Sequence, residues 1–203
     1  GILLQDVLSN YDAYVIRFAL LNNMYSNDID ITDNFFANAM RHVYKMYSVM
    51  DAAGAREYPD ANANQTATMV QTITDEFRSA MDDNFNTYGV IVNAFKWFDF
   101  ISAQLAKKHT EYDLGVIVVK IRELFGVLNI LQSNPAQYLE TLRTQILAKN
   151  NITADEIQTQ IDARASAKAS RDYATADRIR NELLSRGITL MDSPSGTTWD
   201  VIL

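Results

Sequence analysis

The feature that most constrains the fold of this chain is a repeated spacing of apolar residues. Between residues 33 and 50, apolar side chains recur at intervals of four, three, four and three, and the same intervals return between 114 and 128. Segments 70–81 and 91–105 show a similar spacing. Because this is the period of an α-helix with one buried face, it predicts four amphipathic helices. The short linkers between them favour an antiparallel bundle.

A further helix and one linker complete the prediction for the bundle. Asp12 is a suitable N-cap for a helix that runs to Met24, whose apolar residues lie nearly all round it. Such a distribution predicts deep burial. The linker from 52 to 63 contains Gly54 and Pro59, so we expect it to be the least ordered part of the bundle.

The pattern changes near residue 150. Thr153 followed by Glu156 is a capping box that begins a helix, Asp172 can cap a second helix, and Gly187 suits its end. The turn residues 193–196 then separate two short predicted strands, 188–191 and 197–202. The expected fold class is therefore mainly α. An antiparallel helical bundle over 31–149 is followed by a small mixed α/β helix–helix–hairpin module over 150–203.

Composition excludes several kinds of site. The chain of 203 residues has no cysteine, which excludes disulfides, thiolate metal sites and cysteine nucleophiles. Its two histidines are too few for a histidine-rich metal site. Asp82 and Asp83 lie beside a helix junction, where capping explains them better than catalysis. No apolar run approaches the ~20 residues of a membrane helix. We therefore expect no catalytic residue and no metal ligand in this chain.

The charge of the chain is unevenly distributed. The formal net charge is −7, which argues against a broad surface that coats nucleic acid. Between 164 and 186, however, six basic residues outnumber three acidic ones. The basic residues are Arg164, Lys168, Arg171, Arg178, Arg180 and Arg186. Their alternative interpretation is a solvated helix face, in which Arg178 pairs with Glu182 one turn later. Any contact with phosphates should therefore be local to this segment.

Tyr173 and Asp177 are the best candidates for reading an unpaired base. They are four residues apart on a predicted helix, so their side chains share a face. An aromatic ring can stack on a base, and a carboxylate can accept hydrogen bonds from base amino groups. Alternatively, Tyr173 is a core residue against Ile179, and Asp177 pairs with a neighbouring arginine. Asp192 precedes the turn, where it could hydrogen-bond local backbone or read a base. Trp199 is expected to fill the core of the hairpin.

Three parts of the chain, in this order, resemble the cysteinyl-tRNA synthetases, a class I aminoacyl-tRNA synthetase family; the last part consists of two stretches. Residues 3–21 are similar to the segment that follows the family's KMSKS loop. Residues 81–87, MDDNFNT, resemble MDDDFNTP, and residues 171–188 and 192–199 resemble KDYA-x-AD-x-IR-x-EL-x-x-x-GI and DTP-x-GT-x-W. Two departures stand out. Tyr88 replaces a frequent proline, and the residues after Trp199 are not basic as in many relatives.

The resemblance implies the C-terminal tRNA-binding region of a cysteine–tRNA ligase, without its catalytic domain. The HIGH and KMSKS signatures and the zinc ligands are absent, so ATP and zinc are expected in the parent enzyme and no cofactor in this chain. With Gly1 in place of methionine, we expect a piece of a longer parent. By itself the chain should supply tRNA binding and identity selection, not chemistry. Residues 1–30 would connect it to the catalytic domain and approach the inner corner of the tRNA.

The resemblance also implies residues and partners. The positions implicated in anticodon binding are Lys168, Tyr173, Asp177 and Asp192; we assign phosphate binding to Arg164, Arg171, Arg178 and Arg180. The expected partners are the anticodon stem-loop of cysteine tRNA and the catalytic domain of the same parent, with no membrane and no DNA, in the cytoplasm. The alternative is a helical protein-interaction domain that has lost RNA binding, which the acidic net charge favours.

Overall fold

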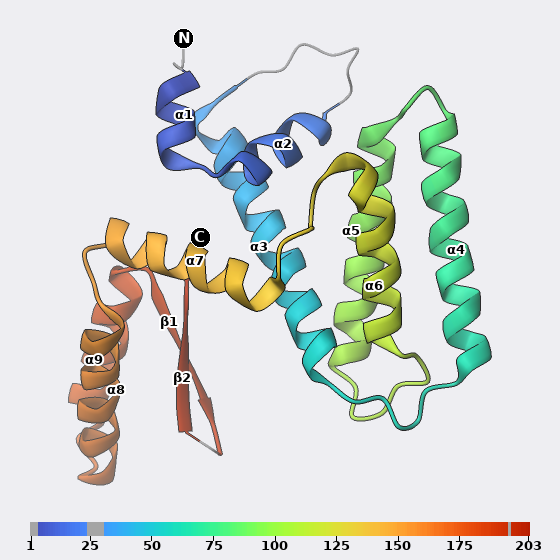
Figure 1. The fold of residues 1–203 in the computed structure, drawn as a ribbon. Coiled ribbons are helices and arrows are strands. Elements are labelled where there is room, and N and C mark those ends of the chain that lie inside the picture. Colours follow the sequence, from blue (N-terminus) through green and yellow to red (C-terminus); the bar gives the residue numbers. More distant parts are fainter. Residues whose placement is uncertain (1–3, 24–30, 195) are drawn as a thin grey trace. The chain divides into compact units, whose positions relative to one another are not determined.

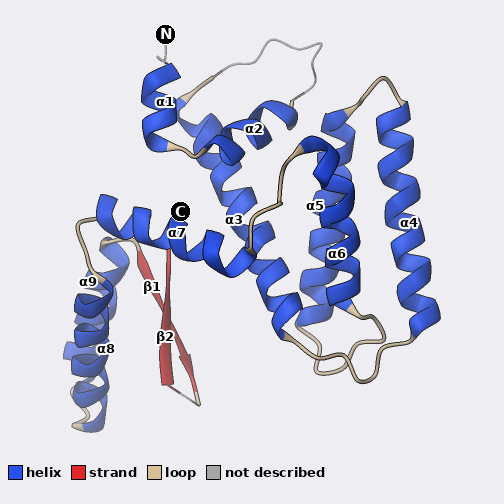
Figure 2. Ribbon diagram, viewed as in Figure 1, coloured by secondary structure: helices blue, strands red, loops and turns tan. Residues whose placement is uncertain are grey.

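A computed structural model of the chain describes residues 4–23, 31–194 and 196–203 (Figure 1). The chain divides into two compact units, Gly1–Gln137 and Tyr138–Leu203, each of which is described by itself. Helices dominate both units, and the described residues form one small antiparallel sheet of two strands (Figure 2). The predicted mainly α fold class is confirmed.

The first unit contains the helical bundle. Its helices are α1 (Leu4–Asn10), α2 (Ala13–Leu21), α3 (Asp33–Ala55), α4 (Ala63–Asp82), α5 (Thr87–Leu105) and α6 (Leu114–Phe125), followed by the 3-10 turn η1 (Gly126–Leu128). The four predicted amphipathic helices correspond to α3, α4, α5 and α6. Helix α4 packs on α5 and α6, and α3 packs on the same two helices.

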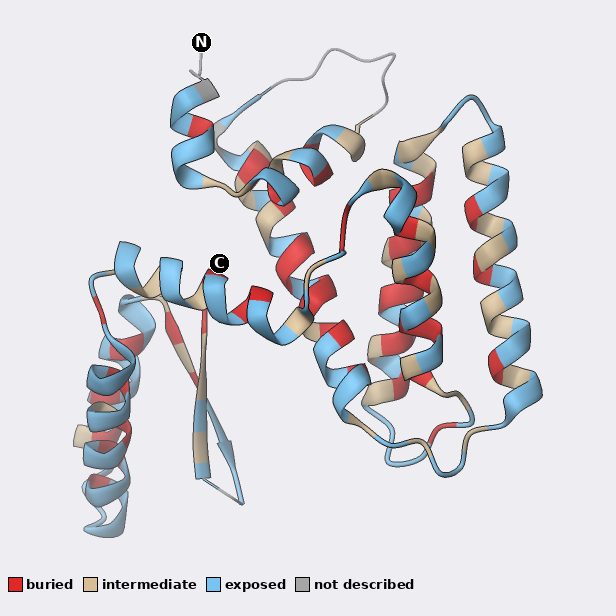
Figure 3. Ribbon diagram, viewed as in Figure 1, coloured by how far each residue is buried: buried red, intermediate tan, exposed pale blue. Residues whose placement is uncertain are grey.

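The bundle core is built from aromatic and branched side chains of these helices, which line the inner faces coloured as buried in Figure 3. Trp97 and Phe125 meet edge to face, with ring centroids 6.3 Å apart. The indole N–H of Trp97 donates to Glu76 Oε2 at 2.6 Å, so the buried ring keeps a partner for its polar atom.

Two expectations for the first unit differ from the structure. Asp12 caps α2 as predicted, but α2 buries one side only, and Leu20 is 46% exposed. The predicted deep burial of α2 is therefore wrong, and Met24 lies outside the described residues. The linker after α3 is ordered by specific bonds. The Arg56 guanidinium donates to the carbonyl oxygens of Leu105 and Lys108, at 3.1 and 2.7 Å. Helix α3 itself continues through Gly54.

The second unit contains most of α7 (Pro135–Lys149), together with α8 (Ala154–Ala169), α9 (Tyr173–Ser185), β1 (Ile188–Ser193) and β2 (Gly196–Val201). The sequence places a boundary at 149/150, the end of α7, whereas the compact units divide after Gln137. The physical reason is that α7 contacts the hairpin. Arg143 on α7 pairs with Asp200 on β2, with Nε and Oδ1 3.1 Å apart.

Local signals in the second unit were predicted correctly. Thr153 and Glu156 form the reciprocal capping box of α8, and Asp172 accepts the Thr175 N–H at the start of α9. Gly187 ends α9 with a φ of +76°, and a Cβ there would lie 2.6 Å from Asn150 Nδ2. The left-handed conformation therefore favours glycine at this position, and any larger residue would also displace the Asn150 amide.

The hairpin has a register that puts one face on the helices. Ile188 pairs with Val201, Leu190 with Trp199, and Asp192 with Thr197. Because cross-strand partners share a face of the sheet, these three pairs lie on one side. Ile188 and Leu190 are buried on this side, and α9 packs against both β1 and α8. Asp192 and Trp199 therefore belong to the inner face of the hairpin.

Candidate nucleic-acid interface

Asp192, near the end of β1, connects the hairpin to α8. Its Oδ1 and Oδ2 atoms pair with Nη1 and Nη2 of Arg164, both at 2.9 Å. Lys168 Nζ lies 3.0 Å from Oδ2, and the Thr197 hydroxyl donates to Oδ1 at 2.7 Å. A carboxylate offers about four acceptor positions, two on each oxygen, and all four are used here. Asp192 can accept from another molecule only if one of these donors moves.

These contacts fix the charge of Asp192. The hydrogen bonds from Arg164, and then those from Thr197 and Lys168, hold the pKa of Asp192 well below its ordinary value. The carboxylate therefore stays ionised at neutral pH. Of its two basic partners, Lys168 is the accessible one, because its side chain is 42% exposed and that of Arg164 only 4%. Lys168 is the donor that can turn outward to meet a second anion.

Arg164 occupies a different environment from the exposed phosphate contact expected from sequence. It lies three residues after Ile161 and seven after Ile157, so it continues the buried face of α8. Its Nε atom is buried and has no hydrogen-bond partner among the described residues. The guanidinium thus holds Asp192 from beneath the hairpin, and the structure does not present it to solvent.

Tyr173 and Asp177 lie on the exposed side of α9. Tyr173 is 62% exposed, while Ile179 is buried, so the alternative of a core tyrosine packed on Ile179 is wrong. Asp177 is exposed and makes no ion pair with any residue that the structure describes. Hydrogen bonding to Asp192 raises the pKa of Arg164, and the negative charge of Asp177 adds to this increase.

The remaining predicted basic residues separate into two kinds. Arg178 pairs with Glu182 one turn later, with Nη1 and Oε1 2.7 Å apart, as its alternative interpretation predicted. Arg171 and Arg180 are exposed, and within the described part of the chain neither side chain has a hydrogen bond or an ion pair. By the helical period, Arg180 shares a side of α9 with Tyr173 and Asp177, whereas Arg178 does not.

Arg171 has an unusual backbone conformation. Its φ is +60°, in the left-handed region, between α8 and α9. Its N–H donates to the Lys168 carbonyl at 3.1 Å, and the Asp172 N–H donates to the Ala167 carbonyl at 2.8 Å. These two bonds form a Schellman motif, in which glycine is the preferred residue. The turn therefore holds an arginine at a conformational cost, directly beside Tyr173.

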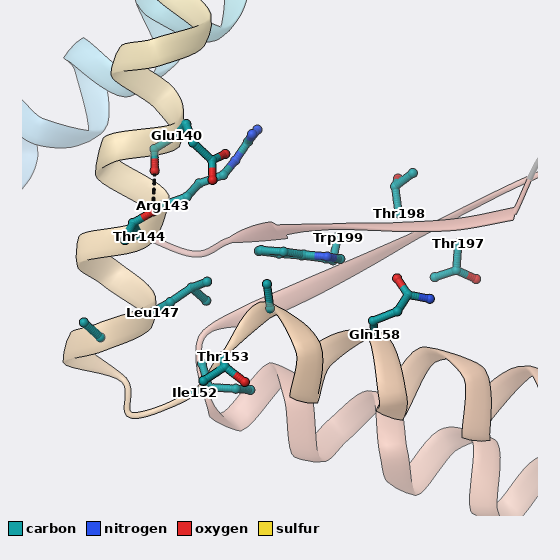
Figure 4. A pocket seen from close by; sticks show the side chains of 12 residues that line it. Glu140, Arg143, Thr144, Leu147, Ile152, Thr153, Gln158, Thr197, Thr198 and Trp199 are labelled. Atoms are coloured by element: carbon teal, nitrogen blue, oxygen red, sulfur yellow. Dashed lines mark hydrogen bonds between the residues drawn. The ribbon is translucent and has the colours of Figure 1, made fainter.

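A cavity of about 680 Å³ lies elsewhere in the second unit and was not foreseen from sequence. It is bounded by the C-terminal half of α7, the first turns of α8, and β2 (Figure 4). Trp199 lines it and is only partly buried, so the prediction that Trp199 fills the hairpin core is wrong. A tryptophan preceded by Thr197 and Thr198 is the signal that the sequence offers. The distance of α7 from β2 depends on tertiary packing, which sequence spacing does not report.

Other kinds of site are not apparent in the described residues. Among them, no cluster of three or more histidine, aspartate or glutamate side chains is arranged to bind a metal ion. None of the helices formed by these residues has the length and apolar character needed to span a membrane. The distinctive features of the second unit are therefore the Asp192 cluster, the exposed face of α9 and the cavity.

Comparisons with known proteins give one consistent result. No family model matches the chain. The cysteine–tRNA ligase of Anaeromyxobacter dehalogenans is 34% identical over 203 residues, which cover 98% of this chain and 41% of the ligase. That of Geobacter metallireducens is 33% identical over 208 residues, covering 98% and 43%, and that of Variovorax paradoxus is 33% identical over 199 residues, covering 97% and 38%. The chain thus spans about two fifths of the length of the curated relatives that it matches, and the resemblance stated from sequence is confirmed.

Proposed function

We propose, from its homology to cysteine–tRNA ligases, that this chain is the C-terminal part of such an enzyme and recognises the anticodon of cysteine tRNA. The parent would attach cysteine to its tRNA with ATP, in the cytoplasm, and this chain would supply binding and identity selection. The observation that carries the proposal is the exposed Tyr173 ring, one turn before Asp177, which has no ion pair with any described residue; both lie in the same unit as the Arg164–Asp192–Lys168 cluster.

Tyr173 is suited to stack on an unpaired base. It is the first residue of α9, whose start is fixed by the Asp172 cap, so little backbone freedom is lost when a base docks. Stacking on an aromatic side chain contributes about 1–3 kcal/mol per base and tolerates any base. Tyr173 thus accounts for affinity and leaves base selection to polar neighbours.

Asp177 and Lys168 are the neighbours that can select a base. Asp177 lies one turn after Tyr173 on the same side of α9, where its oxygens can accept from the amino group of guanine, cytosine or adenine. Lys168 can donate to a base carbonyl or a phosphate if it leaves Asp192. Asp192 then orients Lys168, and Arg164 keeps Asp192 in place as a positioning residue. We therefore propose a positioning role for Arg164 in place of phosphate binding.

Phosphates would be contacted at the periphery of this site. Arg171 and Arg180 flank Tyr173 and have no competing acidic partner in the described structure, while Arg178 would have to leave Glu182. The local excess of basic residues between 164 and 186 favours RNA binding at this segment. The remainder of the chain is acidic, since the net charge is −7, and it repels RNA. The net charge remains the argument for the alternative, a protein-interaction domain without RNA binding.

The first unit would have a connecting role. We propose that residues 1–30 link the bundle to the catalytic domain of the parent, near the inner corner of the tRNA. ATP and zinc belong to that domain in this proposal. The bundle, with its buried aromatic core, would be the scaffold of this region.

The proposal is tested by gel mobility shift with cysteine tRNA, whose anticodon is GCA, and with the same tRNA carrying a changed anticodon. The unsubstituted chain should prefer the tRNA with the GCA anticodon. Asp177→Ala should bind both with similar affinity, because the lost edge contact removes selectivity more than affinity. Asp155→Ala, which replaces an exposed aspartate on the first turn of α8, is the control and should retain the preference. Equal binding of both tRNAs by the unsubstituted chain would contradict the proposal.

A further inference from the structure

The cavity beside Trp199 has a shape and lining that the anticodon-reading site does not explain. Figure 4 shows the indole ring between β2 and α8, directed toward α7, with the Gln158 side chain rising from α8 toward the hairpin. The volume of about 680 Å³ falls within the range of about 300–1,000 Å³ typical of ligand pockets. A strand tryptophan that filled the core would leave no such space.

The lining combines a flat apolar surface with polar groups at one side. Leu147 and Ile152 contribute apolar walls, and Trp199 contributes an aromatic face. The Gln158 amide donates to Asp162 Oδ1 at 2.9 Å, which leaves its carbonyl oxygen and its second N–H for a ligand. The Thr197 hydroxyl donates to Asp192, so toward a ligand it can only accept. A nucleobase has the matching chemistry, namely a planar ring for stacking and an edge of donors and acceptors.

The cavity is connected to the candidate RNA site by one residue and one helix. Thr197 lines the cavity and also donates to Asp192 Oδ1 at 2.7 Å. Gln158 precedes Lys168 by ten residues on α8, which corresponds to about 15 Å along the helix axis. A few nucleotides of unstacked strand can span that distance. A base contacted by Gln158 and a base or phosphate contacted by Lys168 can therefore belong to one RNA loop.

We propose that the cavity takes an unpaired nucleobase, stacked on Trp199 and contacted at its edge by Gln158. The base comes from the same tRNA loop that Tyr173 reads, and to this extent the inference rests on the proposed function. Thr197 then contacts both sites, because its hydroxyl donates to Asp192 and its side chain lines the cavity.

The first experiment measures how far acrylamide quenches tryptophan fluorescence in the intact chain. The chain has two tryptophans, and Trp97 is 2% exposed, so the accessible emission comes from Trp199. An anticodon stem-loop RNA should protect this emission from the quencher. Adenosine and cytidine monophosphates at millimolar concentration provide the second arm, which asks whether the cavity accepts a base without the rest of the RNA.

The second experiment blocks the cavity and measures RNA affinity. Ala154 is exposed at the start of α8 and lines the cavity, so Ala154→Phe should fill part of it without burying new charge. Loss of one stacked base should weaken stem-loop binding by roughly tenfold. Ala163→Phe, on the opposite side of α8 by the helical period, is the matched control and should bind as the parent does. In a second pair, Gln158→Ala should weaken stem-loop binding, and Gln160→Ala is its control and should not.

The outcomes separate this inference from the function on which it rests. If Tyr173→Ala weakens RNA binding but Ala154→Phe and Gln158→Ala do not, the cavity proposal is overturned and anticodon reading stands. If monophosphates protect Trp199 but the stem-loop does not bind, the cavity binds a base and the RNA assignment is overturned. If neither ligand protects Trp199, the base-binding cavity is overturned.

Discussion

Replacing Asp192 by asparagine should destabilise the second unit by about 2–3 kcal/mol at neutral pH. The substitution keeps the shape of the side chain but leaves Arg164, with a side chain 4% exposed, without its counter-charge. Breaking a buried ion pair costs about 3–5 kcal/mol, whereas an exposed pair contributes about 0–1 kcal/mol. Because the Asp192 side chain is 46% exposed and asparagine still accepts from one guanidinium nitrogen, the expected cost lies between these values.

The effect should depend on pH in a direction set by the pKa of Asp192. Because the folded-state pKa lies below the unfolded value of about 3.9, the carboxylate contributes its full stabilisation above that pH. As the pH falls below about 4, the unfolded chain binds the proton first, so the stability advantage of the parent over Asp192→Asn shrinks. It is lost as the pH falls through the folded-state pKa.

The assay is urea unfolding followed by Trp199 fluorescence, with every variant in a Trp97→Phe background so that the signal reports the second unit. Asp162→Asn is the control, since Asp162 is an exposed aspartate on α8 that accepts from Gln158 only one turn away, and it should change stability by less than about 0.5 kcal/mol. The reasoning is refuted if Asp192→Asn unfolds like this control at neutral pH. It is also refuted if the difference between parent and Asp192→Asn stays constant down to pH values well below 4.

Two further predictions concern the turn and the basic residues. Arg171→Gly should stabilise the second unit by about 0.5–1 kcal/mol. The left-handed conformation costs a non-glycine residue about 1–2 kcal/mol, and glycine loses part of that gain to unfolded-state entropy. The same variant should bind RNA several-fold more weakly, whereas a lower melting temperature than that of the unsubstituted chain would argue against the Schellman geometry. Stem-loop binding should weaken with salt at a log–log slope of about −2 to −3, from three or four contacted phosphates. A slope near zero would favour the protein-interaction alternative.

The helices and their caps could be predicted because their causes are local. The four-three spacing of apolar residues in α3 and α6, and the Thr153–Glu156 capping box, depend on residues within a few turns of each other. The burial of α2 could not be judged in this way. Its apolar residues lie nearly all round the helix, but only one side of it meets α3 and α5.

The sequence predicts which residues belong to the candidate site better than how these residues are oriented and buried. The charge of Arg164 suggests phosphate binding, but its position after Ile157 and Ile161 places it on the buried face of α8. Arg171 in a left-handed conformation has no sequence signal, because arginine is not favoured there. The cavity beside Trp199 depends on where α7 packs, which is a tertiary property. Charge and residue type are thus readable from sequence, while orientation requires the fold.

The central claim, that Tyr173 stacks on an anticodon base, is tested most directly by titrating the anticodon stem-loop of cysteine tRNA against three chains. Relative to the parent, Tyr173→Ala should bind roughly tenfold or more weakly, and Tyr173→Phe should bind almost equally, because the ring and not the hydroxyl stacks. Both should melt like the parent, since the side chain is 62% exposed. Unchanged binding by a folded Tyr173→Ala would contradict the claim.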